Sequence, residues 1–524
     1  MTQRETTSGP ASPRASAALA AWLAPAVVLA VAVRAMSPLP VGAFYDDAVY
    51  VELGKALASG AGLHYLHLPG TPAATHFPPG YPLLLAALWR LWPAFPANVF
   101  LFKLVNALLV AVAALWLARI ARQRFGCTPW GAAAAAVVLA IGVPTLVLST
   151  AVLSEPLFLA VALVALLVAE RAADADRGSV HAALAGILAG IARLVRTQGI
   201  ALVGALVLVL LVRRRYRQAL VSAGAALVVL APWTWWVHAH AGALPTPARG
   251  IYGSYLTWYV DALRAGGIPL LASTLHGTLR QLAATFETIL AVVPSHALGG
   301  AALLLLVPLT ALGVWCARAA APVTLVFLAL FMGITLVWPY NPIRFVFGVW
   351  PLLAALPLLG VIALWRSHLP FSVPGWLRAG LLVLAAIPLA GYVGYNVRGY
   401  RGQWWKSIPA RRGLELRAVI LAVRQAVPAD AVVCGTDDAA IYLYTGRQAV
   451  PFGGLDATAF THPPSNAQSA RELQSILAAY HPGRVIVMTQ GQRDVADLLA
   501  HQHPPLLTVS DSFPGGFIYH STER

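Results

Sequence analysis

The chain has 524 residues, of which 59% are hydrophobic and only 11% are charged, and its mean hydropathy is +0.71. This composition excludes an ordinary soluble globular protein and indicates a polytopic membrane protein. The net charge of +16 comes largely from arginines in short clusters between apolar runs, a pattern that signals membrane topology and argues against nucleic-acid binding.

The first apolar segment, 17–36, is long for a signal-peptide core and no cleavage site follows it, so it is predicted to be a retained span. Taking a span as about 20 apolar residues, with shorter ones tolerated inside a bundle, we predict about eleven membrane helices. They are expected near 17–36, 98–118, 130–148, 153–170, 179–195, 199–212, 218–237, 296–316, 322–338, 345–365 and 379–397.

Short cytoplasmic loops retain basic residues, which fixes the predicted orientation. The N-terminal tail, 1–16, is then cytoplasmic, and the loops 37–97 and 238–295 lie on the outer face of the plasma (inner) membrane. Segment 79–92 contains Arg90 and is predicted to be an interfacial helix, because a span there would invert every later loop. The inner loops carry Arg119, Arg122, Arg124, Arg171, Arg177, Arg213, Arg214, Arg215, Arg217, Arg318, Arg366 and Arg378.

Hydrophobicity falls after Arg398, and 398–524 is predicted to be a small extracytoplasmic α/β domain behind the transmembrane domain 17–397. Helices are expected at 413–426, 438–444, 469–480 and 494–501, and strands at 431–434, 484–488, 506–509 and 517–520. The domain has no glycine-rich phosphate loop, so its predicted role is to cover or assist the membrane part.

An acidic pair, Asp46-Asp47, follows the first span in a chain with very little charge. One interpretation is structural, with Asp47 capping a helix over 48–58. The other is a general base that faces a membrane-borne substrate. Both interpretations stay open on the residues alone.

Two arginines depart from the inside bias, Arg196 between the fifth and sixth spans and Arg344 between the ninth and tenth. Charged side chains near the bilayer are costly, so these are functional candidates, although each could extend to lipid headgroups. An outward acid and outward arginines suit an anionic, lipid-anchored substrate, because a guanidinium binds two phosphate oxygens. Glu155, at another outer helix end, is open to a helix-dipole or a functional interpretation.

A metal site is not predicted from the histidines and cysteines. His64, His67 and His76 match no known ligand spacing. The cysteines, at 127, 316 and 434, fall in different parts of the predicted topology, so a disulfide framework is not expected either.

Together these segments resemble glycosyltransferase family 39, the protein O-mannosyltransferase and lipid A aminoarabinose transferase branch of the C-type membrane glycosyltransferases. That family carries an acidic pair in the first external loop and a Pro-Pro element at its end, matched here by Asp46-Asp47 and 76–82 (HFPPGYP). Similar to bacterial members are also 154–157 (SEPL), 196–199 (RTQG), the region around Arg344 and 442–447 (YLYTGR).

The resemblance implies a C-type helical bundle that transfers a sugar from a polyprenyl-phosphate donor to an acceptor hydroxyl of a lipid, glycan or protein, with inversion. It implies that Asp46 is the general base, and Arg344 and then Arg196 are our choices for the donor phosphate. Candidates to orient the loop or the acceptor are Asp47, Tyr50 and His76, and Glu155 and Tyr340 are further candidates.

The chain also departs from the aminoarabinose transferases. It has Val49 where they have Arg, and His76-Phe77 where they have Glu-Lys. The resemblance therefore leaves the sugar open, as it does participation of a divalent cation. A lipid or sugar transporter is the alternative function, although no internal repeat supports it. A membrane scaffold is a third, and it would give Asp46 no role.

Overall fold

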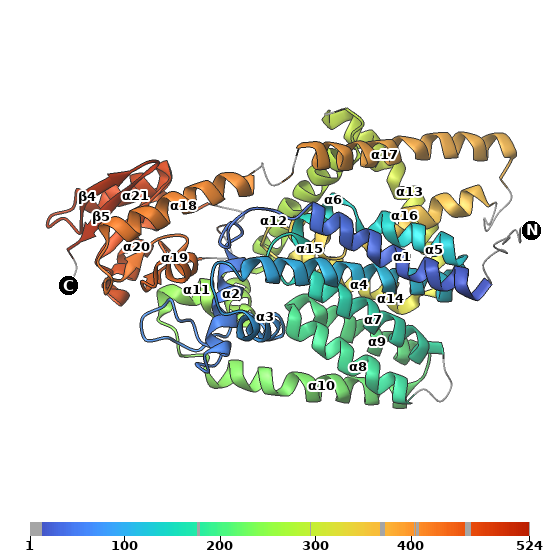
Figure 1. Cartoon of the computed structure of the whole chain (residues 1–524), viewed down its shortest axis with the longest axis horizontal. Coiled ribbons are helices and arrows are strands. Elements are labelled where there is room, and N and C mark those ends of the chain that lie inside the picture. Colours follow the sequence, from blue (N-terminus) through green and yellow to red (C-terminus); the bar gives the residue numbers. More distant parts are fainter. Residues whose placement is uncertain are drawn as a thin grey trace, which may run out of the picture.

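The computed structural model describes residues 13–174, 179–293, 295–366, 373–402, 404, 408–455, 459 and 463–522. An elongated helical bundle carries a small α/β unit, formed by the C-terminal residues, at one end (Figure 1). Helix α1 (Pro13–Arg34) begins at the opposite end of the bundle. Residues 1–12 of the predicted cytoplasmic tail and Arg177 lie outside the described residues.

Long apolar helices form the bundle, and the protein is a multi-pass membrane protein. Within the described residues, six helices are long and apolar enough to cross a membrane: α1, α4 (Val99–Phe125), α7 (Glu155–Asp174), α10 (Tyr216–Ala239), α13 (His296–Ala320) and α17 (Gly375–Gly402). Shorter apolar helices are α8 (Ser179–Val195), α9 (Ile200–Val212), α14 (Pro322–Val337) and α16 (Trp350–Trp365). Each of these helices overlaps a predicted span.

The third predicted span is broken in the structure. It consists of α5 (Pro129–Ala140) and α6 (Val143–Ser149), which meet at an angle of 66°. Gly142 lies at the break, where a Cβ atom would stand 2.3 Å from the Tyr392 hydroxyl. Pro144 starts the new helix, where its missing N–H leaves no hydrogen bond unmade.

Small residues allow α13 and α16 to pack closely. A Cβ at Gly313 would lie 1.8 Å from the Leu356 carbonyl oxygen, and one at Gly360 would lie 2.1 Å from the Leu309 carbonyl oxygen. Such close backbone contact replaces the hydrophobic effect as a source of helix association in lipid.

Shorter elements collect at the end of the bundle that faces the α/β unit (Figure 1). They are α2 (Asp46–Ala58), α3 (Gly80–Leu91), η1 (Thr197–Gly199), α11 (Arg249–Tyr252) and α15 (Ile343–Gly348). Helix α3 coincides with the predicted interfacial helix. The predicted outer loop 238–295 contains a long helix that the sequence pattern did not predict, α12 (Tyr255–Leu290), with non-helical backbone at Gly267 (φ 54°) just before Pro269.

The C-terminal unit combines a sheet with helices, as predicted, and the sheet has five strands where four were predicted. The strand order is β2-β1-β3-β5-β4. Strand β1 pairs in parallel with β2 and β3, whereas β5 pairs antiparallel with β3 and β4. The bounds are α18 (Ile408–Ala426), β1 (Val433–Cys434), α19 (Asp438–Thr445), β2 (Ala449–Val450), α20 (Asn466–Tyr480), β3 (Arg484–Val487), α21 (Gln490–Ala500), β4 (Leu507–Phe513) and β5 (Gly516–Ser521). Strand β2 was not predicted.

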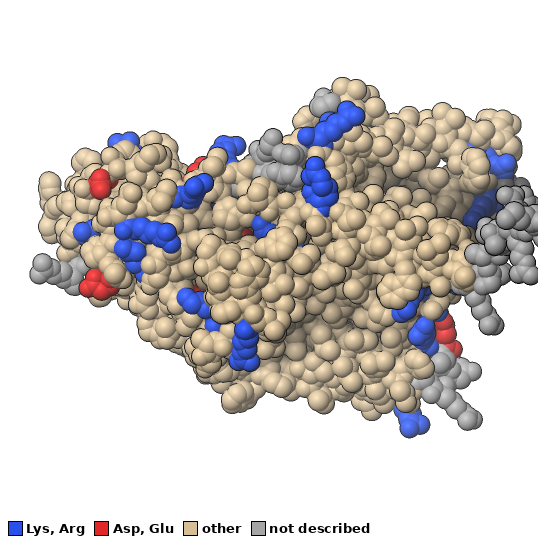
Figure 2. Space-filling view, in the orientation of Figure 1, with Lys and Arg blue, Asp and Glu red and all other residues tan. Residues whose placement is uncertain are grey.

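Charged side chains on the surface lie mainly away from the middle of the helical bundle. Figure 2 shows uncharged surface over the middle of the helical bundle, with Lys and Arg toward both of its ends. An uncharged band of this kind is what a lipid-facing surface requires.

Candidate active site

Most of the candidate residues line one cavity of about 620 Å³ at the end of the bundle that faces the α/β unit. The cavity walls come from α2, the loop before α3, η1, the start of α12 and α15, and Leu455 of the C-terminal unit closes one side. The candidates on the wall are Asp46, Tyr50, His76, Arg196, Tyr340 and Arg344.

A chain of ion pairs joins the acidic motif to both arginines. Arg344 donates through Nη1 to Asp46 Oδ2 at 2.7 Å and through Nε to Glu155 Oε1 at 2.7 Å. Arg196 Nη1 lies 2.8 Å from the same Glu155 oxygen. Two carboxylates and two guanidinium groups therefore balance in charge, although they come from four separate segments of the chain.

The four groups differ in access to the cavity. The side chains of Asp46 and Arg344 are 27% and 28% exposed, whereas those of Arg196 and Glu155 are 8% and 2% exposed. Glu155 lies behind the arginines and does not line the cavity. It thus acts as a fixed buried anion that orients both guanidinium groups toward the open side.

Asp47 points away from the cavity. Its Oδ1 accepts hydrogen bonds from the backbone N–H groups of Phe44 and Ala48 at 3.2 and 3.1 Å. Burial raises the pKa of the Asp47 carboxyl to about 6, although the backbone N–H groups of the turn partly offset this effect. The predicted cap needs correction, because α2 begins at Asp46 and its N-cap is Tyr45. Asp47 instead ties the turn that precedes the helix.

His76 and Tyr50 are buried beside the charged groups. The His76 Nδ1–H donates to the Gly253 carbonyl oxygen at 2.7 Å, which leaves Nε2 as an acceptor. Burial lowers the pKa of His76 to about 4, so the ring is neutral at physiological pH. The Tyr50 hydroxyl hydrogen-bonds Ser154 Oγ at 3.1 Å, and Ser154 also accepts from Arg196.

Aromatic rings cover the side of the cavity opposite the acidic motif, and most of them escaped the sequence prediction. Tyr255 packs on His76 with ring centroids 3.6 Å apart and on Tyr340 at 6.2 Å. Trp338 stacks with Tyr340 at 6.2 Å. Tyr255 opens α12, and because no helix was predicted there, nothing in its sequence context distinguished it.

The described residues do not form a metal site. None of their His, Cys, Asp and Glu side chains gather in groups of three or more that could hold an ion. Between Asp46 and Glu155, where a cation would balance the two carboxylates, the Arg344 guanidinium already lies. The histidines 64, 67 and 76 do not converge either.

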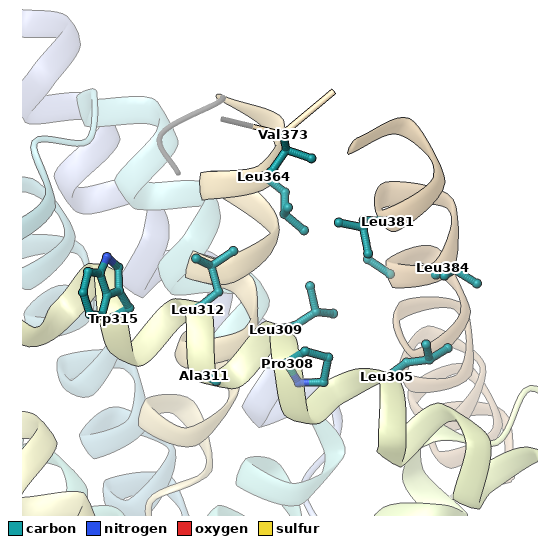
Figure 3. A pocket seen from close by; sticks show the side chains of 11 residues that line it. Leu305, Pro308, Leu309, Ala311, Leu312, Trp315, Leu364, Val373, Leu381 and Leu384 are labelled. Atoms are coloured by element: carbon teal, nitrogen blue, oxygen red, sulfur yellow. The ribbon is translucent and has the colours of Figure 1, made fainter. Parts of the chain in front are cut away.

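A smaller hollow of about 380 Å³ at the loop between α4 and α5 is lined by Arg119, Arg122 and Gln123, whereas two other hollows in the bundle are apolar. A groove of about 570 Å³ lies between α13, α16 and α17, and leucine side chains such as Leu309, Leu364 and Leu381 point into it (Figure 3). None of its lining residues carries a polar functional group except Trp315. Such a groove can hold hydrocarbon but offers no group for chemistry. The charged cavity is the candidate active site because it has both a carboxylate and guanidinium groups on its wall.

Comparisons with known proteins agree with this arrangement. The sequence model of the family described as dolichyl-phosphate-mannose-protein mannosyltransferase matches residues 76–236, a span that includes His76, Glu155 and Arg196. The structure is similar to ArnT from Cupriavidus metallidurans bound to undecaprenyl phosphate, with a TM-score of 0.53 and 14% sequence identity over 95% of this chain and 97% of that chain. The protein has the fold of a C-type glycosyltransferase.

A second solved structure has a similar fold. The apo oligosaccharyltransferase from Archaeoglobus fulgidus gives a TM-score of 0.50 with 12% identity, over 91% of this chain and 71% of that chain. A search of curated proteins gave no match. The resemblance to C-type glycosyltransferases that the sequence motifs indicated is therefore confirmed.

Proposed function

We propose that this C-type glycosyltransferase transfers a sugar from a polyprenyl-phosphate donor to an acceptor hydroxyl at the extracytoplasmic face, with inversion at the anomeric carbon. The observation that carries the proposal is the Asp46–Arg344 ion pair on the wall of the charged cavity. It combines a proton acceptor and an anion-binding group at one point, as this reaction requires.

In the proposed reaction the acceptor oxygen attacks the anomeric carbon, and the bond from that carbon to the phosphate oxygen breaks. Asp46 takes the acceptor proton, for which its carboxylate must be ionised and within about 3 Å of the hydroxyl. Its Oδ2 is held by Arg344, which fixes the direction of the carboxylate. The polyprenyl phosphate leaves with one more negative charge than the donor phosphodiester carried.

Arg344 and Arg196 are the proposed phosphate ligands. Each has an Nη2 group with no hydrogen bond to the described residues, and both residues line the cavity. A donor phosphate that binds Arg344 competes with Asp46 for the guanidinium and so releases the carboxylate to act as a base. Because the leaving phosphate gains charge as the bond breaks, these contacts strengthen in the transition state.

The aromatic wall is the proposed contact for the sugar. Tyr255, Tyr340 and Trp338 line the cavity beside the charged groups, and an apolar sugar face packs well against aromatic rings. The neutral His76 offers Nε2 as an acceptor for a sugar or acceptor hydroxyl.

An apolar cavity supplies space for a lipid chain. It measures about 640 Å³ and is lined by α5, α12, α13, α16 and α17, beginning at Trp350, where the helix after Arg344 starts. ArnT, the similar structure above, binds undecaprenyl phosphate. The predicted topology supports the extracytoplasmic face, because the loops that carry Asp46 and Arg344 lie opposite the arginine-rich loops.

A labelling experiment tests the proposal. Membranes that contain the protein, and matched membranes with Asp46→Asn, are incubated with radiolabelled polyprenyl-phosphate hexoses and pentoses. We expect label on an endogenous lipid, glycan or protein acceptor only with the wild type. Label that crosses the bilayer without forming a new product would favour a transporter, and no transfer of any tested sugar would contradict the proposal.

A further inference from the structure

A second cluster of ionisable side chains lies outside the cavity, where the C-terminal unit meets the short outer elements. Glu52 of α2, His67 of the following loop, Tyr252 of α11 and Asp438 of α19 are all fully buried, with 0% exposure. No reaction step proposed above uses any of them. Their burial therefore needs a separate explanation.

His67 lies between the two carboxylates of this cluster. Glu52 Oε1 accepts the His67 backbone N–H at 2.7 Å, and Glu52 Oε2 lies 2.7 Å from His67 Nδ1. His67 Nε2 faces Asp438 Oδ2 at 3.7 Å, which is an ionic contact and too long for a hydrogen bond. Burial lowers the pKa of His67, but the Glu52 and Asp438 carboxylates outweigh it, so the net pKa is raised.

Such a cluster is a costly way to join two surfaces. Replacement of a buried ion pair by apolar residues of similar volume is often neutral or stabilising. Buried polar groups instead fix geometry, because their hydrogen bonds hold the elements that carry them in one orientation. The cluster is therefore expected to orient one of the elements that it joins.

Hydrogen bonds lead from the cluster to the cavity. The Tyr252 hydroxyl donates to Asp438 Oδ2 at 2.6 Å and shares a second hydrogen bond with the Tyr45 hydroxyl at 2.8 Å. Tyr45 lines the cavity and directly precedes Asp46. Its backbone has φ 64°, a left-handed conformation that persists in a non-glycine residue only where its surroundings hold it.

The cluster contacts α2 at its start, through Tyr45 directly before the first residue, and at its middle, through Glu52. Both residues reach the C-terminal unit, Tyr45 through the Tyr252 hydroxyl and Glu52 through His67, which faces Asp438. Asp46 directly follows Tyr45 and lines the cavity. Further contacts, such as the Ala449 N–H to the His67 carbonyl oxygen at 2.7 Å, join the same two surfaces.

We propose that Glu52, His67, Asp438 and Tyr252 form a positioning network through which the C-terminal unit holds Tyr45 and thereby sets where the Asp46 carboxylate stands. This inference rests on the proposed function of Asp46. These are positioning residues, because none of the four lines the cavity. The C-terminal unit then contributes to the geometry of the active site in addition to covering it.

Tyr252→Phe gives the sharpest test, since it removes one oxygen atom and with it both hydrogen bonds. The ring contacts with Tyr65 and His67, at 4.8 and 4.9 Å, are kept. The matched control is Tyr519→Phe, which removes a hydroxyl that donates to Asp497 at 2.9 Å in the same C-terminal unit. Steady-state kinetics of both variants and of the wild type are compared, together with their thermal unfolding.

For Tyr252→Phe we expect a fall in kcat of about 10- to 100-fold, because small displacements of a catalytic group have effects of this order. The KM for the donor should stay within about twofold, since both arginines are untouched, and Tyr519→Phe should match the wild type. A structural role alone would lower the yield or melting temperature but leave the kcat of the folded protein unchanged, and that result would overturn the proposal.

Asp438→Asn serves as a second variant if Tyr252→Phe does not fold. It keeps the shape of the side chain and removes the charge opposite His67, and its kcat should also fall. Combined with Tyr252→Phe, it should add little to the loss, because both act through one chain of contacts. If the wild type transfers no sugar, the proposed function fails; if it does and Tyr252→Phe equals Tyr519→Phe, only the positioning network fails.

Discussion

Two ionic clusters lie side by side along α2, and they differ in access to solvent. The cavity cluster, Asp46, Arg344, Glu155 and Arg196, has two side chains that are more than a quarter exposed. The sealed cluster, Glu52, His67, Asp438 and Tyr252, has none with any exposure. One helix thus carries a group that can meet a ligand and a group that cannot.

The difference separates two uses of buried charge. The cavity cluster contains arginines, which stay charged at any physiological pH and can exchange an internal carboxylate for a bound phosphate. The sealed cluster contains a histidine between two carboxylates and has no space for a ligand, so it can only keep its elements in place. Substitutions in the first should change donor use, and substitutions in the second should change stability and kcat.

Arg344→Ala should give the largest loss of donor use. It removes the shared partner of Asp46 and Glu155 and the first phosphate ligand, so kcat/KM for the donor should fall by about 10²- to 10³-fold. Kinetics with varied donor and varied acceptor provide the measurement. Arg264→Ala, which affects an exposed pair with Asp261, is the control. Equal losses for donor and acceptor would contradict a phosphate role.

Glu52→Gln should reduce stability most among the sealed residues. It removes the charge that faces His67 and replaces one of the two accepting oxygens by an NH₂ donor, and loss of one member of a buried ion pair costs about 3 kcal/mol. Thermal unfolding in detergent measures the loss. The same melting temperature as the wild type would show that the cluster does not hold the C-terminal unit on the bundle.

The contribution of the sealed cluster to the stability of the folded protein should depend on pH. The pKa of His67 is raised in the folded protein, so its stabilising charge is fully present below about 6.5, its unfolded value, and is lost as pH rises through the folded pKa. The difference in melting temperature between wild type and Glu52→Gln should therefore narrow from pH 6 to pH 9; a constant difference would contradict this.

Glu287→Gln should have the smallest effect. Glu287 pairs with His296 at 3.1 Å, the same two residue types as Glu52 and His67, but His296 is 91% exposed. Solvent screens such a pair, and its loss should change the free energy of unfolding by less than about 1 kcal/mol. A loss of stability as large as that of Glu52→Gln would mean that burial does not determine how much these Glu–His pairs stabilise the protein.

The sequence predicted the cavity cluster better than the sealed one, for a physical reason. Charge is rare in this chain, so Asp46, Arg196 and Arg344 were conspicuous beside apolar spans. Asp438 looked like an ordinary first residue of a helix, and His67 like a solvated loop residue. Their meeting depends on how the C-terminal unit docks, which no local pattern encodes.

The helices and strands likewise divide into those that a local pattern predicted and those that it did not. Long apolar runs and the α/β pattern of 398–524 predicted most helices and strands, because periodic burial leaves a signal over many residues. Strand β2 has two residues and left none. Helix α12 carries Tyr255 but is broken at Gly267 and Pro269, which made its segment look like a loop.

The most direct test of the account is turnover and donor binding of Asp46→Asn, with Asp261→Asn on the exposed face of α12 as its control. General-base removal should lower kcat by about 10²- to 10⁴-fold, while the protein still inserts in the membrane and binds the polyprenyl-phosphate sugar through Arg344 and Arg196. Wild-type turnover by Asp46→Asn would contradict the central claim that this carboxylate takes the acceptor proton.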